Sequence, residues 1–503
     1  MLRYLNDKVY IKGKMMARKP IGNNKNLNMR PNINVGCTID IPTSSILTGK
    51  NGESIINGGL SSIEGIAGLG NNFKSTILHY LTLTAMDRME ATIPDKVTLH
   101  TYDTENNMSL NLDRYNHLGN EICEYLPKDL INNNIWTITT KSESPGMVWV
   151  KDFLYKHINE KENDKDALVV YTAFMNKITK EPLKLPYPSF IEIDSLSELE
   201  DDSTMDTLEV KELSKTNTLF MQQGLFKSKV MKDLPRLSNK ANVYISLTVH
   251  LGKKIDMSTG PFSPKPVKEL QYSKQDEKFK GATDKLNFLT THLWKAFGAS
   301  SFINQTTKEP EFPSHKQDVN TDLNIVKTLQ YRSKTGHSGY TLELVVSQND
   351  GVLPELTEFK YLKDNKYGIG GNVRSYFLEL VPDISLSRTT VRNKLKENKQ
   401  LARACNILTE IHQLSIYKPQ YRPLICTGQE LYDDLIALGY DWDILLNTRG
   451  WWSIDQYNTD VIPFLSSVDL LKMRKELYIP FWMDKDKKIK KEWQHHFNKK
   501  NDK

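Results

Sequence analysis

The chain has 503 residues, of which 39% are hydrophobic and 25% are charged; this is typical of a folded globular protein and long enough for two or more structural units. It lacks an apolar run near the roughly 20 residues of a membrane span, and residues 1–8 lack a signal-peptide core, so we expect a cytoplasmic protein without membrane partners. The four cysteines (Cys37, Cys123, Cys405 and Cys426) are far apart and form no C-x-x-C pair, which argues against a zinc site and a disulfide framework.

The formal net charge of +6 is unevenly distributed, because residues 1–35 hold eight basic side chains and one acidic side chain, Asp7. A second basic patch lies within residues 484–503. Basic ends attract nucleic-acid phosphates, but they equally suit solvated, disordered tails. We predict a basic N-terminal arm over residues 1–35 and consider it a candidate polymerisation element.

Residues 68–76 have the spacing of a phosphate-binding P-loop, with Phe73 where most such loops have a second glycine. An apolar run at 65–67 precedes them and a helical pattern at 77–83 follows. A strand, a turn and a helix N-terminus thus meet where a triphosphate can sit. We predict that Lys74 contacts the phosphates and that Ser75 ligates Mg²⁺; the alternative is a glycine-rich turn with an incidental Lys-Ser pair. The predicted nucleotide-binding residues are Gly68, Leu69, Gly70, Asn71, Asn72, Phe73, Lys74, Ser75 and Thr76.

A strand, a helix and a β-hairpin are predicted after the P-loop. Residues 96–103 read as a buried strand that ends at Asp103-Thr104-Glu105, and a helix is expected over about 110–118. Residues 167–172 and 183–186 flank a polar turn, which predicts an inserted β-hairpin.

The apolar run 189–195 reaches an acid, Asp194, near its end. This is the pattern of a Walker B strand, whose carboxylate orients the water shell of Mg²⁺. Helical segments are expected between about 216 and 237, and a strand over 243–249 ends at His250. Strands that alternate with helices predict a mainly parallel α/β sheet with ligands at the carboxyl ends of its strands.

The segment 251–285 lacks a regular pattern, and loops of that length are usually functional or disordered. Paired strands are predicted at 324–331 and 341–346. Residues from about 372 onward are helix-rich. Within them, 385–395 resembles the recognition helix of a helix-turn-helix, although we favour a helical packing role there.

The order of these signals, from Lys74-Ser75 through 102–105 and 191–195 to His250, resembles that of the RecA-type recombinases. The Phe-Lys-Ser and Tyr-Asp-Thr-Glu segments are most similar to the tailed-phage UvsX branch. The resemblance covers residues ~36–350 and implies a RecA-like P-loop core that uses ATP and Mg²⁺.

The resemblance also implies roles for single residues. Glu105 would be the general base that polarises the attacking water, although it could instead neighbour a helix N-cap. Asp194 would position Mg²⁺. His250 would sense the γ-phosphate and pass its state to a DNA-binding loop, against the alternative of a merely structural histidine.

The family's DNA-binding loops fall near 222–229 and within 251–285. The predicted DNA-binding residues are Lys227, Lys229, Lys253, Lys254, Lys278, Lys280 and Gly281, because lysines bind phosphates as point charges; exposed basic loops without this role are the alternative. Arg332 and Lys334 match the family's basic pair that reaches the γ-phosphate of a neighbouring subunit, against a plain hairpin with basic edges. The basic C-terminus departs from the acidic tail that is common in the family.

We therefore predict an arm over 1–35, a RecA-like ATPase core over 36–370, and a helix-rich C-terminal region of unknown role over 371–503. The implied protein is an ATP-dependent recombinase, phage-encoded and acting in the host cytoplasm. It would form filaments on single-stranded DNA and pair it with double-stranded DNA, with mediator and single-strand-binding proteins as partners. The alternatives are a hexameric DNA helicase that forms rings and a non-enzymatic, ATP-liganded DNA-binding regulator.

Overall fold

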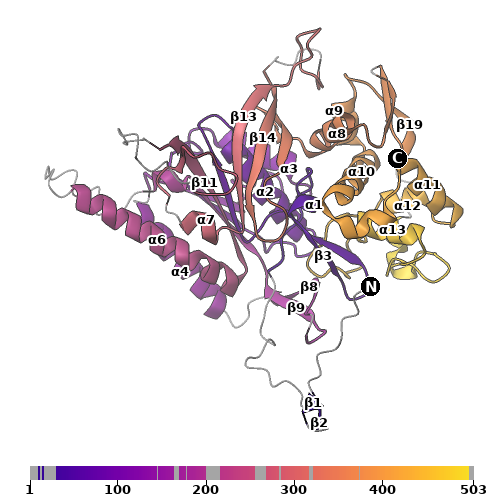
Figure 1. The fold of residues 1–503 in the computed structure, drawn as a ribbon, viewed down its shortest axis with the longest axis horizontal. Helices are drawn as coiled ribbons and strands as arrows, with labels where there is room; N and C mark the ends of the chain where they lie inside the picture. The colour runs from indigo at the N-terminus through magenta and orange to yellow at the C-terminus, as the bar shows by residue number, and fades with distance from the viewer. Residues whose placement is uncertain are drawn as a thin grey trace.

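The structure is a computed structural model. It describes residues 10–11, 14–15, 30–143, 146–163, 169–176, 178–199, 216–254, 268–282, 285–315, 321–372 and 374–497. Within these residues, ten strands form one central sheet in the order β16-β15-β14-β13-β5-β11-β10-β6-β7, with β12 paired to β11 (Figure 1). The predicted α/β core is thereby confirmed.

The sheet has a parallel part and an antiparallel part. The parallel strands are β5 (Ile63–Gly68), β6 (Leu99–Asp103), β7 (Trp136–Thr140), β10 (Ser189–Asp194), β11 (Val243–Lys253) and β13 (His292–Ser301). The antiparallel strands are β14 (Leu323–Ser333), β15 (Thr341–Ser347), β16 (Gly351–Val352) and β12 (Glu277–Phe279). The pairing of β14 with β15 matches the sequence prediction.

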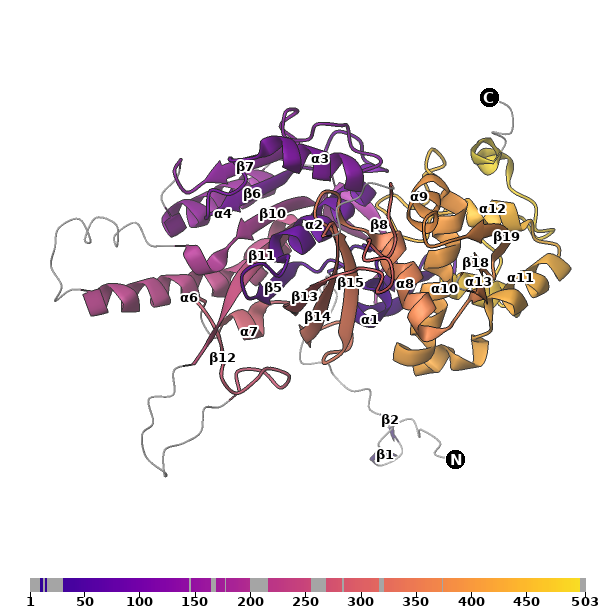
Figure 2. The ribbon, with the colours of Figure 1, turned by 90° about the horizontal axis from the view of Figure 1, so that it is seen from above.

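Helices cover both faces of the parallel part, as a parallel sheet requires. One face packs against α2 (Lys74–Glu90) and the other against α4 (Gly146–Asn163), α6 (Thr216–Ala241) and α7 (Lys285–Leu289). Figure 2 shows α6 extending beyond the edge of the sheet. The helix α3 (Leu112–Ile122) follows β6 and packs against α2.

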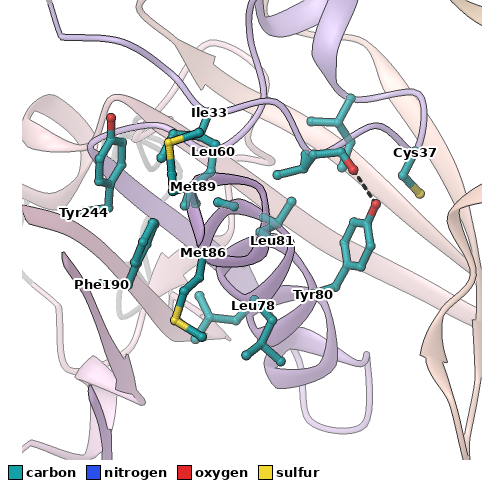
Figure 3. Packing of buried hydrophobic residues seen from close by; sticks show 14 of the residues in the cluster. Ile33, Cys37, Leu60, Leu78, Tyr80, Leu81, Met86, Met89, Phe190 and Tyr244 are labelled. Carbon is teal, nitrogen blue, oxygen red and sulfur yellow. Dashed lines mark hydrogen bonds between the residues drawn. The ribbon is translucent and has the colours of Figure 1, made fainter. Parts of the chain in front are cut away.

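Side-chain alternation along β10 decides which residues meet which helices. Ile191 and Ile193 belong to the cluster under α4 and α6, whereas Phe190 belongs to the cluster under α2. Figure 3 shows Phe190 and Tyr244 on the side of α2 that carries Met86 and Met89. Burial of each such side chain stabilises the fold by roughly 1.5–3 kcal/mol.

The structure also contains several smaller elements. They are the helix α1 (Asp40–Thr43), the strand pair β1 (Tyr10–Ile11) and β2 (Lys14–Met15), the hairpin of β3 (Ser45–Thr48) and β4 (Ser54–Asn57), and the hairpin of β8 (Val169–Met175) and β9 (Pro182–Pro186). The last of these confirms the predicted inserted hairpin.

The C-terminal region contains a small sheet as well as helices. Its elements are α8 (Pro354–Asn365), β17 (Ile369–Asn372), β18 (Ser375–Leu378), β19 (Val381–Leu386), α9 (Val391–Glu397), α10 (Lys399–Tyr417), α11 (Gly428–Ala437), α12 (Trp442–Leu446) and α13 (Ser467–Arg474), with short 3₁₀ turns at Pro419–Leu424 and Lys491–His496. A further 3₁₀ turn, Leu196–Glu198, follows β10. One apolar cluster joins Ile325 and Val345 of the central sheet to Phe359 and Leu408. Packing is therefore continuous across residue 370, and the predicted domain division stays a prediction.

The helix-turn-helix interpretation of 385–395 is wrong. Residues 385–386 belong to β19. Within this segment only residues 391–395, which lie in the seven-residue helix α9, are helical. Arg392 is buried and forms ion pairs with Asp322 and Asp350 at 3.0 and 2.9 Å. This basic side chain holds α9 against the central sheet and does not project towards solvent.

Two predictions around His250 also need correction. The strand β11 does not end there but continues to Lys253, and β12 pairs with its extension. Residues 251–254 and 268–282 are thus partly ordered as a two-stranded ribbon, whereas 255–267 and 283–284 lie outside the described residues. Among the helices that the structure describes, none is long and apolar enough to cross a membrane.

Candidate nucleotide-binding site

The predicted P-loop connects β5 to the N-terminus of α2. Asn71 and Phe73 have φ values of 58° and 56°, a left-handed conformation that costs a non-glycine residue roughly 1–2 kcal/mol. Gly68 has no room for a side chain, because a Cβ there would lie 2.8 Å from the Ala296 carbonyl. No side-chain hydrogen bond caps the described N-terminus of α2, so its first backbone N–H groups suit an anion such as a phosphate.

Lys74 is buried at the first position of α2. Its ammonium donates to the Leu69 carbonyl at 2.9 Å, within its own loop. Burial lowers the pKa of Lys74, while the nearby carboxylates of Asp194 and Glu105 act in the opposite direction. Lys74, Asp194 and Glu105, three of the predicted site residues, therefore lie close enough for their charges to interact.

Asp194 lies at the carboxyl end of β10, directly beside Asp103 of β6. The Thr248 hydroxyl of β11 donates to its carboxylate. Asp103 serves the backbone instead: it accepts the N–H groups of Glu105 at 3.1 Å and Met108 at 2.7 Å. Asp103 is thus committed to shaping the turn, which leaves Asp194 and Glu105 as the chemically available carboxylates.

Glu105 is held by three side chains from different elements. It accepts from His250 Nε2 at 2.9 Å, from Asn107 Nδ2 at 2.9 Å and from the Ser195 hydroxyl at 3.5 Å. His250 also lies beside Gly68 in the register of β11 and β5. The predicted base and the predicted sensor are therefore in direct contact beside the predicted P-loop.

The ribbon starts at this histidine. The Lys280 N–H donates to the His250 carbonyl at 2.8 Å, and Gly252 is paired with Lys278. The stem of Lys280 covers Gly252, where a Cβ would meet its Cε at 2.7 Å. Lys253, Lys278 and Lys280 are exposed, so their ammonium groups are accessible to solvent.

The other predicted DNA contacts differ among themselves. Lys229 is exposed on α6, whereas Lys254 is half-buried and lies 3.5 Å from Glu269. Lys227 is buried, and its ammonium donates to the carbonyls of Leu196, Ser197 and Gly281 at 2.9–3.3 Å. We correct Lys227 to a structural role, because its donors are committed to the backbone.

Gly281 also has a structural reason for its identity. Its φ is +61°, and a Cβ there would lie 2.3 Å from the Ser197 carbonyl. The Ser197 hydroxyl accepts a hydrogen bond from the His250 N–H at 2.7 Å and donates one to the Lys280 carbonyl at 2.8 Å. Gly281 thus allows the ribbon to close against the turn that follows β10.

Arg332 and Lys334 lie far from this site within the same chain. Because β14 runs antiparallel to β13, Arg332 is level with Leu293 and Gly65, near the amino ends of the parallel strands. Lys334 donates to the Leu289 carbonyl at 3.2 Å, while Arg332 Nε is buried without a partner among the described residues. Burial lowers the pKa of Lys334, with the Arg332 charge acting the same way.

The donor set suits Mg²⁺ bound to a triphosphate. Such an ion keeps several waters and takes few protein ligands, and a hydroxyl from Ser75 with a carboxylate from Asp194 match that need. The part of the chain that the structure describes contains no group of three or more histidine, cysteine or acidic side chains able to hold a metal by themselves.

Sequence reasoning missed Thr248, Ser197 and Asn107. Thr248 precedes His250 by two residues, so strand alternation places both on one side of β11; that spacing was an available signal. Asn107 lies two residues after Glu105, in a turn that local patterns leave undefined.

No protein-family model and no curated protein matches this chain.

Proposed function

We propose that this chain is an ATP- and Mg²⁺-dependent DNA recombinase with a RecA-like core, which assembles on single-stranded DNA and pairs it with a homologous duplex. One observation carries the proposal. His250 lies beside Gly68, contacts Glu105, and holds the basic ribbon through its carbonyl. A nucleotide site and a DNA-binding surface with one histidine between them suit a DNA-dependent ATPase.

The P-loop residues would bind the triphosphate. The N-terminus of α2 offers unsatisfied N–H groups, and Lys74 would exchange its contact with the Leu69 carbonyl for a phosphate. Ser75 and Asp194 would hold Mg²⁺, which would neutralise charge on the phosphates.

Glu105 would act as the general base. Its carboxylate is half-exposed and oriented by His250, Asn107 and Ser195, so it can accept a proton from water at Oε1 or Oε2. His250 would hold the carboxylate in place for this step. A phosphate that shifted His250 would also shift Lys280, because the Lys280 N–H donates to the His250 carbonyl.

Assembly is proposed from the position of Arg332 and Lys334. They lie at the opposite end of the strands from their own P-loop, so they would reach only the nucleotide of a neighbouring copy. This arrangement would couple hydrolysis to filament formation.

The test is ATP hydrolysis with and without single-stranded DNA, together with electron microscopy in the presence of an ATP analogue. We expect DNA-stimulated turnover and filaments on the DNA. Closed rings would favour the helicase, and ATP binding without turnover would favour the regulator.

A further inference from the structure

A second polar pair lies inside the core, beneath the proposed nucleotide site. His79 Nδ1 of α2 donates to Glu192 Oε2 of β10 at 2.9 Å, and both side chains are at most 1% exposed. The same carboxylate oxygen accepts from the Thr101 hydroxyl of β6 at 2.7 Å, and Trp136 Nε1 donates to Thr101 at 2.8 Å. One carboxylate therefore connects α2, β10 and β6.

Three members of this network are one helical turn, or two strand residues, away from a residue at the proposed site. His79 is four residues after Ser75, so both lie on one face of α2. Glu192 is two residues before Asp194, and Thr101 is two before Asp103, so strand alternation places each pair on one face of the sheet. The network thus braces the three elements that present the proposed site.

Fold stability alone does not account for this pair. His79 Nε2 is buried without a hydrogen-bond partner among the described residues. Buried polar atoms left unpaired are costly, and apolar replacements of buried pairs are often neutral or stabilising. A geometric role at the site explains why a polar pair stands where apolar side chains would pack.

We propose that His79 and Glu192 are positioning residues that set the separation of α2 and β10, so that Ser75 and Asp194 can share one Mg²⁺. The inference rests on the proposed nucleotide site. Neither residue needs to touch the nucleotide. Groups behind metal ligands typically alter metal affinity by 10–100-fold when they are lost.

The test compares Glu192→Gln and the double variant His79→Leu/Glu192→Leu with the unmutated chain. Binding of a fluorescent ATP analogue is titrated with Mg²⁺, and separately in EDTA. We expect both variants to need at least ~10-fold more Mg²⁺ for half-maximal binding, with binding in EDTA unchanged. Thermal unfolding should give the double variant a melting temperature equal to or above that of the unmutated chain.

Glu64→Gln is the matched control. Glu64 is equally buried, lies 3.3 Å from His292 Nδ1 and accepts from Trp294 Nε1 at 2.6 Å, but it is near the amino end of β5, away from the P-loop. Its Mg²⁺ requirement should stay within about twofold of the unmutated value.

Three results would overturn the inference: an unchanged Mg²⁺ requirement in folded Glu192→Gln, an equal loss of binding in EDTA, or the same effect from Glu64→Gln. If the double variant does not fold, Glu192→Gln alone decides the outcome. If the unmutated chain binds no nucleotide under either condition, the proposed function itself fails, which is a distinct result.

Discussion

Phe73 adopts a left-handed backbone conformation at the position where most P-loops have glycine. Its side chain is partly buried against the core cluster that includes α2. Replacement by alanine removes the packing and keeps the strain, whereas glycine removes both. We expect Phe73→Gly to have a higher free energy of unfolding than Phe73→Ala by about 1 kcal/mol, measured by urea denaturation. The reverse order would argue against the left-handed conformation.

Substitutions at Glu105 and Lys74 should distinguish ATP hydrolysis from ATP binding. We expect Glu105→Gln to bind ATP but to hydrolyse it at least ~100-fold more slowly, the scale of a lost general base. Lys74→Ala should abolish detectable ATP binding. Isothermal titration and a phosphate-release assay measure the two effects. Near-normal turnover in Glu105→Gln would make another carboxylate the base.

At the scale of elements, the ribbon of β11 and β12 is the proposed contact to DNA. We expect Lys278→Ala/Lys280→Ala to weaken single-stranded DNA binding whatever the base sequence and to make its salt dependence shallower, because phosphate contacts are lost. Fluorescence anisotropy at several salt concentrations measures both quantities.

The control for this change is Lys156→Ala/Lys180→Ala, which removes the same charge from two exposed positions outside the ribbon. It should leave the affinity for DNA nearly unchanged. Equal losses in the two double variants would mean that net charge, and not the ribbon, governs DNA binding.

At the scale of the whole molecule, a buried acidic cluster joins the N-terminal segment to α8 and α10. Glu358 accepts from the Cys37 N–H at 3.2 Å and from Asn406 Nδ2 at 3.0 Å. Burial raises the pKa of Glu358 to about 8, with Glu355, Glu410 and Asp40 adding to the rise. Burial likewise raises the pKa of Glu410 to about 7.

A carboxyl with a raised pKa in the folded state binds more protons there than in the unfolded chain. Stability is then fully present below the unfolded pKa and is lost as pH rises towards 8. We expect the free energy of unfolding to fall by roughly 2–4 kcal/mol between pH 5 and pH 8, measured by denaturation at each pH. Glu358→Gln should flatten this profile, and an unchanged slope in that variant would refute the assignment.

Assembly gives a prediction about two copies of the chain. If Arg332 acts on a neighbour's nucleotide, mixing Arg332→Ala with Lys74→Ala should restore some ATP hydrolysis, because one interface can then unite an intact P-loop with an intact Arg332. Turnover is measured over a range of mixing ratios. Absence of recovery in proteins shown to co-assemble would exclude action between subunits.

Local pattern in the sequence was enough to locate the turn between β5 and α2, the carboxyl end of β10 at Asp194, and the inserted hairpin of β8 and β9. An apolar run that ends on a polar residue, or a turn between two alternating runs, depends only on neighbouring residues, and the same neighbours determine the strand and its end. The α/β class and the outer strands β14 and β15 followed from the same signals.

Contacts between residues far apart in the sequence decided the rest. Lys227 and Arg392 look like exposed basic residues in the sequence, but each is buried by partners tens of residues away. The extension of β11 past His250 depends on its pairing with β12. The pairing of His79 with Glu192 spans 113 residues. A side chain's type is local information, whereas its burial and its partners depend on which elements pack together, and only the tertiary structure determines those.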